Sequence, residues 1–243
     1  MLSLEPVGIV GAMDEEVQRL TAALADATAQ DAGPFRVGRG RIEDVRVFVA
    51  RCGIGKVNAA ALTQHLLSLG ARSVIFTGVA GALDPSLRVG DLVIGAEAVQ
   101  HDVDVTALGY APGEVPGSGT VFEADARLVR LAREAAATLE GVRSVVGRVA
   151  SGDLFVSSTA ASDRIRRAFD ATCAEMEGAA CAQVCSAWGT PFVVVRSISD
   201  TADHDADVDF RAFTVVAAER AETLVRAMLR RLADSSDEPT GSG

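Results

Sequence analysis

Short apolar segments alternate along this chain with longer segments of helical periodicity, and this alternation limits the possible folds more than any other feature. The apolar segments, each read as a strand, are 7–11, 35–39, 45–50, 73–83, 91–99, 144–150 and 191–199. The helical segments are expected from about 14, over about 56–70, 124–138 and 160–169, from about 177, and over 208–233. Strands that alternate with helices form a parallel or mixed sheet covered on both faces. We therefore expect an α/β fold, a single-domain three-layer αβα sandwich with a mixed, largely parallel central sheet.

No internal repeat and no linker divides the 243 residues, so one domain over 1–233 is expected. The connection over 100–122 is long and contains Pro112, Pro116 and four glycines. Connections of this length are usually functional or disordered. The polar end of the chain, 234–243, is expected to be a mobile tail.

The overall charge disfavours a polyanionic partner. The formal net charge is −10, and a nucleic-acid binder would show a basic stripe instead. No run approaches the roughly 18 apolar residues of a membrane span, and no basic segment followed by an apolar one opens the chain. We expect a cytoplasmic protein with no nucleic-acid partner and no membrane partner. A small, near-neutral substrate is compatible with the acidity.

The sequence shows no pattern typical of a metal or disulfide site. The three histidines form no HExxH pattern, and four cysteines are too few and too scattered for a disulfide scaffold. Cys181 and Cys185 lie four residues apart on a predicted helix with no histidine near them in sequence, which favours buried small apolar residues over a metal pair. No metal and no cofactor is therefore expected.

The glycine-rich turns fail the common nucleotide-binding patterns. Around Gly53–Lys56, position 50 is alanine and position 57 is valine, where a Walker motif needs glycine and serine or threonine. Position 58 is asparagine, so GxGxxG also fails. No serine lies in a GxSxG nucleophile elbow. P-loop, Rossmann and common serine-hydrolase chemistries are thus not indicated.

Carboxylates and glycines remain at the ends of predicted strands, where open α/β sheets bind ligands. Asp200 follows an apolar strand, where it is either a partly desolvated acid with a raised pKa or the cap of a turn. Glu16 and its acidic neighbours also fit a helix start that complements the helix dipole. Glu175 and Glu177 bracket Met176 in the same kind of position. Each signal taken alone leaves both interpretations open.

Seven stretches carry these residues in order: GIVGAMDEEV (8–17), GIGKVNAA (53–60), TGVAGALDPSLRVGDLVI (77–94), QHDVDVTALGY (100–110), SGDLF (151–155), EMEGAACAQVC (175–185) and PFVVVRSISDTAD (191–203). Together they resemble the methylthioadenosine/S-adenosylhomocysteine nucleosidases, within the nucleoside phosphorylase superfamily. The resemblance extends from residue 8 to residue 203. It implies hydrolysis of the N-glycosidic bond of methylthioadenosine and S-adenosylhomocysteine, and of 5′-deoxyadenosine, in methionine salvage.

The resemblance also implies a role for each matching residue. Glu16 would activate water, Glu177 would bind the ribose hydroxyls, and Asp200 would protonate N7 of adenine. The remaining binding residues would orient the carboxylates, hold the base and sugar, or line the pocket: Ser199, Arg196, Glu175, Met176, Phe155, the backbone of Val156, Ile54, Val79 and Phe210. A family loop that completes the neighbour's 5′-thio pocket in a homodimer is matched here by His101–Tyr110 and by Pro116, which would be a binding residue. Val105 and Leu108 would cross that interface.

Within the superfamily, three other activities remain open. Phosphorolysis is disfavoured, because Glu16 would repel phosphate and Val79, which stands where some members carry serine, offers no hydroxyl. Aminofutalosine hydrolysis in menaquinone synthesis would use the same adenine and ribose contacts and differ only at the 5′ pocket. A non-catalytic nucleoside-binding role is disfavoured because all three carboxylates are present.

Overall fold

The computed structural model describes residues 3–203 and 206–237, and they form one α/β domain around a single mixed sheet. The strands are β1 (Val7–Gly11), β2 (Ala25–Ala32), β3 (Phe35–Ile42), β4 (Val45–Arg51), β5 (Ser73–Ala82), β6 (Leu92–Gln100), β7 (Val121–Glu123), β8 (Ser144–Ser151), β9 (Cys173–Glu175) and β10 (Phe192–Asp200). The helices are α1 (Asp14–Ala22), α2 (Lys56–Ser68), the short 3-10 helix η1 (Thr106–Leu108), α3 (Ala126–Ala136), α4 (Thr159–Phe169), α5 (Gly178–Ala187) and α6 (Ala206–Asp237). The predicted fold class is confirmed.

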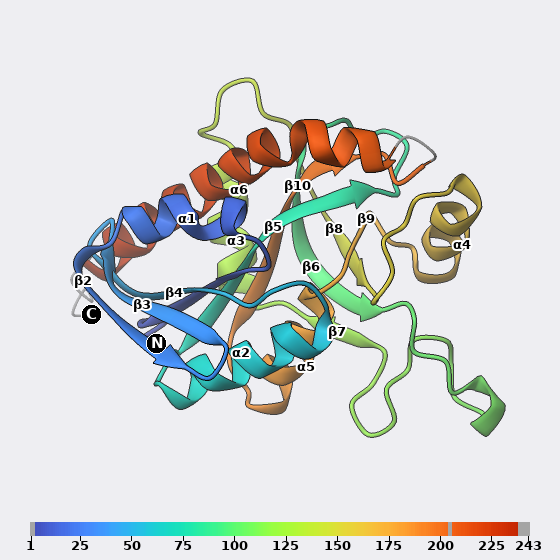
Figure 1. Ribbon diagram of the computed structural model, residues 1–243, viewed down its shortest axis with the longest axis horizontal. Coiled ribbons are helices and arrows are strands. Elements are labelled where there is room, and N and C mark those ends of the chain that lie inside the picture. Colours follow the sequence, from blue (N-terminus) through green and yellow to red (C-terminus); the bar gives the residue numbers. More distant parts are fainter. Residues whose placement is uncertain (1–2, 204–205, 238–243) are drawn as a thin grey trace, which may run out of the picture.

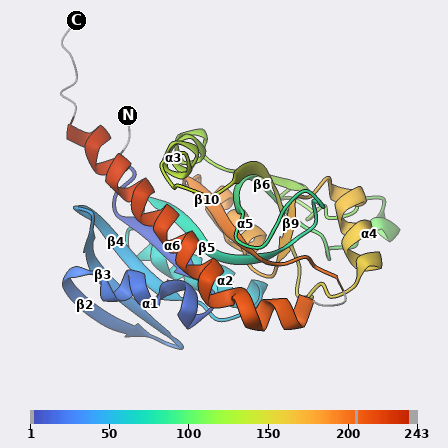
Figure 2. The same ribbon diagram turned by 90° about the horizontal axis from the view of Figure 1, so that it is seen from above.

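Helices cover both faces of the sheet. α1, α3 and α6 pack on one face, and α2 and α5 pack on the other (Figure 1). In the view from above, α6 crosses the sheet diagonally (Figure 2). Successive side chains in a strand point to opposite faces, so a central strand needs apolar residues at every position. β1 and β10 are buried along their whole length. This burial explains the apolar residues of β1 and of Phe192–Val195, whereas the second half of β10 also buries polar side chains, namely Arg196, Ser197, Ser199 and Asp200.

The parallel pairings bring three strand ends to one edge of the sheet. β1 pairs in parallel with β4 and β5, and β10 pairs in parallel with β5. The carboxyl ends of β1, β5 and β10 therefore lie side by side, at the edge where open sheets bind ligands. β10 also pairs with β6, and the path through β8 and β9 returns to β5, so this part of the sheet closes on itself.

Three strands escaped sequence-based prediction. β2 is an exposed edge strand whose apolar residues are all alanines, so it has no large apolar side chains to mark a buried face. β7 and β9 are three residues long, too short for any periodicity. The long connection over 100–122 is confirmed apart from η1 and β7. α6 begins two residues earlier than predicted and is described as far as Asp237, whereas 238–243 of the predicted tail lie outside the described residues.

The predicted burial of Cys181 and Cys185 is confirmed. Both side chains have no exposed surface and belong to the core between the sheet and helices α2 and α5. All four cysteines are free thiols. No helix among the described residues is long and apolar enough to cross a membrane.

Candidate active site

A pocket of about 330 Å³ lies at the edge where β1, β5 and β10 end. Residues expected from the sequence line most of it: Glu16, Ile54, Val79, Phe155, Val156, Glu175, Met176, Glu177, Ser199, Asp200 and Phe210. The three predicted catalytic carboxylates reach it from different elements, the first turn of α1, the residue before α5 and the end of β10. Residues far apart in the sequence thus share one cavity.

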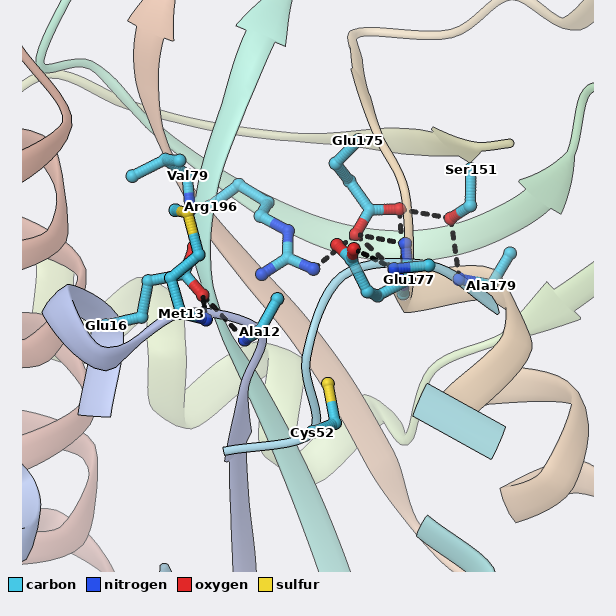
Figure 3. Close-up of polar contacts among 12 residues, drawn as sticks. Ala12, Met13, Glu16, Cys52, Val79, Ser151, Glu175, Glu177, Ala179 and Arg196 are labelled. Atoms are coloured by element: carbon cyan, nitrogen blue, oxygen red, sulfur yellow. Dashed lines mark hydrogen bonds and ion pairs between the residues drawn. The ribbon is translucent and has the colours of Figure 1, made fainter. Parts of the chain in front are cut away.

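Glu16 is held by backbone donors. Its Oε2 accepts hydrogen bonds from the N–H groups of Ala12 at 2.6 Å and Met13 at 3.0 Å, and its Oε1 accepts one from Val79 at 3.0 Å (Figure 3). A carboxylate offers about four acceptor positions, so one remains for a group in the pocket. Burial raises the pKa of Glu16, while Arg196 and the three N–H groups oppose that rise. A buried carboxylate with a raised pKa is suited to take a proton.

Arg196 lies behind the pocket and balances several carboxylates. It forms a buried ion pair with Glu175, and its guanidinium lies over the Phe76 ring at 4.7 Å from the centroid. Burial lowers the pKa of Arg196, but Glu175, Glu16 and Glu177 outweigh this effect and raise it. Arg196 itself does not line the pocket. Its predicted role in orienting carboxylates is supported by these contacts.

Gly78 makes room for this arrangement. A Cβ at Gly78 would lie 2.4 Å from Arg196 Nη1 and 2.4 Å from Glu16 Oε1. In the β5–β10 register Gly78 pairs directly with Arg196. Only glycine lets the guanidinium and the Glu16 carboxylate approach the strand at this point.

Glu175 is used by the protein rather than left free for a ligand. It accepts hydrogen bonds from the N–H of Gly178, from the N–H of Glu177 at 3.2 Å and from the Ser151 hydroxyl. Ser151 Oγ in turn accepts from the N–H of Ala179 at 2.7 Å (Figure 3). A carboxylate at a helix N-terminus is favourable, since the unpaired N–H groups and the dipole both attract it. Glu175 thereby fixes the start of α5, and with it the neighbouring Glu177.

Glu177 is a buried carboxyl with one donor. Its Oε1 accepts a hydrogen bond from the Gly55 N–H at 2.7 Å. Its pKa is raised to about 8, chiefly by burial and also by Glu175 and Glu16, while Arg196 and the Gly55 N–H oppose the rise. The second oxygen stays available on the pocket side, since Glu177 lines the cavity.

Asp200 sits at an irregularity in β10. The register shifts between Ile198, which pairs with Ala80, and Asp200, which pairs with Gly81. Such irregularities re-aim a side chain next to active sites. Asp200 Oδ2 accepts from the Ser199 hydroxyl at 2.8 Å, and Oδ1 accepts from the Ala202 N–H at 2.9 Å. Burial raises the pKa of Asp200 although both of these hydrogen bonds oppose the rise, so the pocket makes its protonated form easier to reach than water does.

Apolar side chains form the rest of the wall. The rings of Phe155 and Phe210 meet edge to face, with centroids 5.6 Å apart and planes at 78°. Phe155 keeps 41% of its surface exposed, so its ring is accessible for stacking against a planar group in the pocket. Met13 and Leu154 also line the cavity and were not singled out from the sequence, although both lie inside the matching stretches.

Besides Arg196, three predicted residues do not line this pocket. Val105, Leu108 and Pro116 lie on the connection that projects from the end of β6 (Figure 1), and none of them lines the cavity of the same chain. Leu108 is 76% exposed and Val105 is half-buried. Among the described residues, no group of three or more histidine, cysteine, aspartate or glutamate side chains is arranged to hold a metal ion.

Known proteins of similar sequence place this chain in one superfamily. The model of the phosphorylase superfamily matches residues 6–230. A 5′-methylthioadenosine/S-adenosylhomocysteine nucleosidase from Geobacillus kaustophilus is 45% identical over 223 residues, which cover 91% of this chain and 95% of that protein.

Solved structures of two related enzymes have the same fold as this chain. The Neisseria meningitidis 5′-methylthioadenosine/S-adenosylhomocysteine nucleosidase in complex with methylthio-immucillin-A has a TM-score of 0.91 at 41% identity, covering 93% of this chain and 98% of that one. A futalosine hydrolase from Helicobacter pylori has a TM-score of 0.88 at 35% identity, covering 93% and 97%.

Proposed function

Because the chain belongs to the phosphorylase superfamily and, within it, to the 5′-methylthioadenosine/S-adenosylhomocysteine nucleosidases, we propose that its pocket hydrolyses the N-glycosidic bond of methylthioadenosine and S-adenosylhomocysteine. It is an N-glycosyl hydrolase. The observation that carries this function is the set of three buried carboxylates, Glu16, Glu177 and Asp200, around one apolar pocket.

Two of the carboxyls have complementary tasks. Asp200 donates a proton to N7 of adenine, so that the C1′–N9 bond breaks and its electron pair leaves with the base. Glu16 takes a proton from water as the water oxygen bonds to C1′. The raised pKa of Asp200 and the free acceptor position of Glu16 support this division. One site runs acid and base chemistry at the same pH when the environments of its carboxyls differ.

The remaining pocket residues hold the substrate. Glu177 accepts hydrogen bonds from the ribose hydroxyls and supports the positive charge that develops on the sugar. Met176 packs under the sugar, Phe155 stacks on adenine, and the backbone of Val156 contacts the edge of the base. Their shared place on the pocket wall supports these roles. Ile54 and Phe210 line the same cavity.

Water is the nucleophile that this pocket favours over phosphate. None of the described residues that line the pocket is lysine, arginine or histidine, and Val79 offers no hydroxyl. The Glu16 carboxylate on the nucleophile side would repel an anion. The test is to follow adenine release and to identify the sugar product in phosphate buffer. With methylthioadenosine as substrate, free methylthioribose supports hydrolysis, and methylthioribose 1-phosphate would refute it.

Aminofutalosine hydrolysis is the second candidate. The Helicobacter pylori futalosine hydrolase shares the fold, but its 35% identity is below the 45% of the Geobacillus nucleosidase. A panel of methylthioadenosine, S-adenosylhomocysteine, 5′-deoxyadenosine and aminofutalosine, compared by kcat/KM, decides between them. The highest value on aminofutalosine would reverse the assignment.

We also propose that the protein is a homodimer in which the 100–116 connection completes the neighbour's pocket. A strongly exposed leucine on a projecting loop supports this, since such residues usually cover a ligand or meet a partner. Val105 and Pro116 lie on the same connection as Leu108. The 5′-thio substituent would then lie between two chains.

A cytoplasmic location fits the thiol chemistry. All four cysteines are free and buried, and proteins of reducing compartments keep their thiols in this state.

A further inference from the structure

The N-terminus of α2 is capped by two carboxylates from other parts of the chain. The residue before the helix is Gly55, which has no side chain to accept the first N–H groups. Instead, the Gly55 N–H donates to Glu177 at 2.7 Å and the Lys56 N–H donates to Asp153 Oδ1 at 2.9 Å. The start of α2 is therefore positioned by one proposed catalytic residue and by one residue with no assigned role.

Lys56, the single lysine of the chain, extends this contact to a third segment. A positive charge in the first turn of a helix opposes the helix dipole, so it needs compensation. The Lys56 ammonium donates to Asp102 Oδ1 at 2.6 Å and to Gln100 Oε1 at 3.0 Å. Asp102 Oδ2 accepts from the Asp153 N–H at 2.9 Å, which closes a triangle of Lys56, Asp102 and Asp153.

The ion pair of Lys56 and Asp102 is partly shielded from solvent, whereas Asp153 is exposed. The side chains of Lys56 and Asp102 are only 16% and 28% exposed, so solvent screens their attraction less than at an open surface. A Cβ at Gly152 would lie 2.4 Å from His101 Nε2 and 3.1 Å from Asp102 Cγ. The segment after β8 thus lies directly against the base of the 100–116 connection.

Each residue of the triangle is followed or preceded in the sequence by residues of the pocket or of the proposed interface. Ile54 lies just before the α2 corner, and Leu154 and Phe155 follow Asp153. The connection that carries Leu108 leaves the sheet after Gln100, and Asp102 is its second residue. Neither aspartate lines the pocket itself.

We propose that Asp102 and Asp153 are positioning residues for this reaction, because with Lys56 they hold the Gly55 N–H against Glu177 and hold Phe155 at the pocket wall. This inference rests on the proposed function. It assigns no substrate contact to either aspartate.

The pH profile separates this role from a merely structural one. Burial, Glu175 and Glu16 all raise the pKa of Glu177, while Arg196 and the Gly55 N–H lower it. When α2 loses its anchor, the Gly55 hydrogen bond weakens and the pKa of Glu177 rises. Glu177 acts as an ionised acceptor, so the low-pH limb of kcat/KM moves to higher pH. A general loss of folded protein would lower the whole profile without moving the limb.

Asp153 offers a matched pair of variants. Asp153→Ala removes the acceptor of the Lys56 N–H, and we expect kcat/KM to fall about 10- to 100-fold, the range for losing a hydrogen bond to a charged group, with the limb shifted to higher pH. Asp153→Asn keeps an oxygen acceptor, and should keep the limb near its wild-type position. Asp31→Ala removes an exposed carboxylate on β2, far from the site, and serves as the control for lost charge.

Two results would overturn the proposal: an unshifted limb in Asp153→Ala, or an equal loss in Asp153→Asn and Asp153→Ala. If Asp153→Ala does not fold, Asp102→Ala carries the same test, because it removes the acceptor of the Lys56 ammonium and of the Asp153 N–H. A wild-type protein that releases no adenine would refute the proposed function, whereas active variants with unchanged profiles would refute only this inference.

Discussion

Arg196 and Glu175 form an ion pair that is almost completely withdrawn from water, with side-chain exposures of 1% and 3%. The pair lies under the pocket, between the carboxylates of Glu16 and Glu177, so one guanidinium compensates several negative charges. Glu175 also accepts from the first N–H groups of α5. The same contact therefore supports the fold and sets the electrostatics of the site.

Removing the charge of Glu175 should destabilise the fold strongly. Glu175→Gln keeps the shape but leaves Arg196 without its buried partner, and breaking such a pair costs about 3–5 kcal/mol of unfolding free energy. Denaturant titration measures the loss. Glu134→Gln is the control, because Glu134 is 47% exposed in its contact with Arg231, and exposed pairs contribute about 0–1 kcal/mol. Equal changes in the two variants would contradict the assignment.

Stability should depend on pH through Glu177. Its pKa rises from 4.5 to about 8 in the folded protein, chiefly through burial. Between these values the folded protein holds a proton that the unfolded chain has lost, so the unfolding free energy falls as pH rises from about 4.5 to about 8. The unfolding free energy of the wild type should fall by roughly 1.4 kcal/mol for each pKa unit between the two values. Glu177→Gln has no carboxyl at this position, so its unfolding free energy should lack this contribution. Thermal unfolding at several pH values measures it, and parallel curves for variant and wild type would refute the assigned pKa.

The segments predicted most closely are those whose burial fixes their composition. A segment buried on both faces of the sheet, such as β1 or Phe192–Val195 of β10, is apolar at nearly every position, so its sequence shows it. β2 is paired on one side and exposed along nearly its whole length, so its backbone pairing with β3 leaves no trace in the side chains. The closure of the sheet through β9 depends on three residues and on distant pairing.

The site shows the same division. The position of Asp200 after an apolar strand indicated a desolvated carboxyl, but a turn cap fitted equally well until the matching stretches were taken together. The contacts that hold the site escaped sequence-based prediction. The hydrogen bond from the Gly55 N–H to Glu177 joins residues 122 positions apart. Its donor is a backbone group, so the identity of residue 55 does not reveal it. Ser151 and Gly78 were missed for the same reason, since only through-space neighbours give them a role.

The proposed dimer predicts a specific kinetic effect at Leu108. Leu108→Asp places a charge on the loop that would cover the neighbour's 5′-thio pocket, so KM for methylthioadenosine should rise much more than kcat falls. Leu108→Met is the matched control, because it keeps an apolar side chain of similar volume. Steady-state kinetics and sedimentation velocity together make the test. A wild-type protein that is fully active as a monomer at assay concentration would exclude the proposal.

Asp200 should matter in proportion to the leaving group's need for a proton. Asp200→Asn keeps the shape and can still hydrogen-bond N7, but it has no proton to deliver. Loss of general acid catalysis typically lowers kcat by about 10²- to 10⁴-fold, or about 3–5 kcal/mol of barrier. Binding should change less, because the proposed contacts of Glu177 and Phe155 do not involve Asp200.

A change of leaving group isolates this role of Asp200. A methylthioribosyl substrate that releases p-nitrophenolate needs little protonation, because that anion is already a good leaving group. Asp200→Asn should therefore keep a much larger share of wild-type activity on this substrate than on methylthioadenosine. Glu16→Gln should impair both reactions, since water must be activated in each. If Asp200→Asn lost the same factor on the two substrates, Asp200 would not be the proton donor, and its hydrogen bonds to Ser199 and Ala202 would be its whole function.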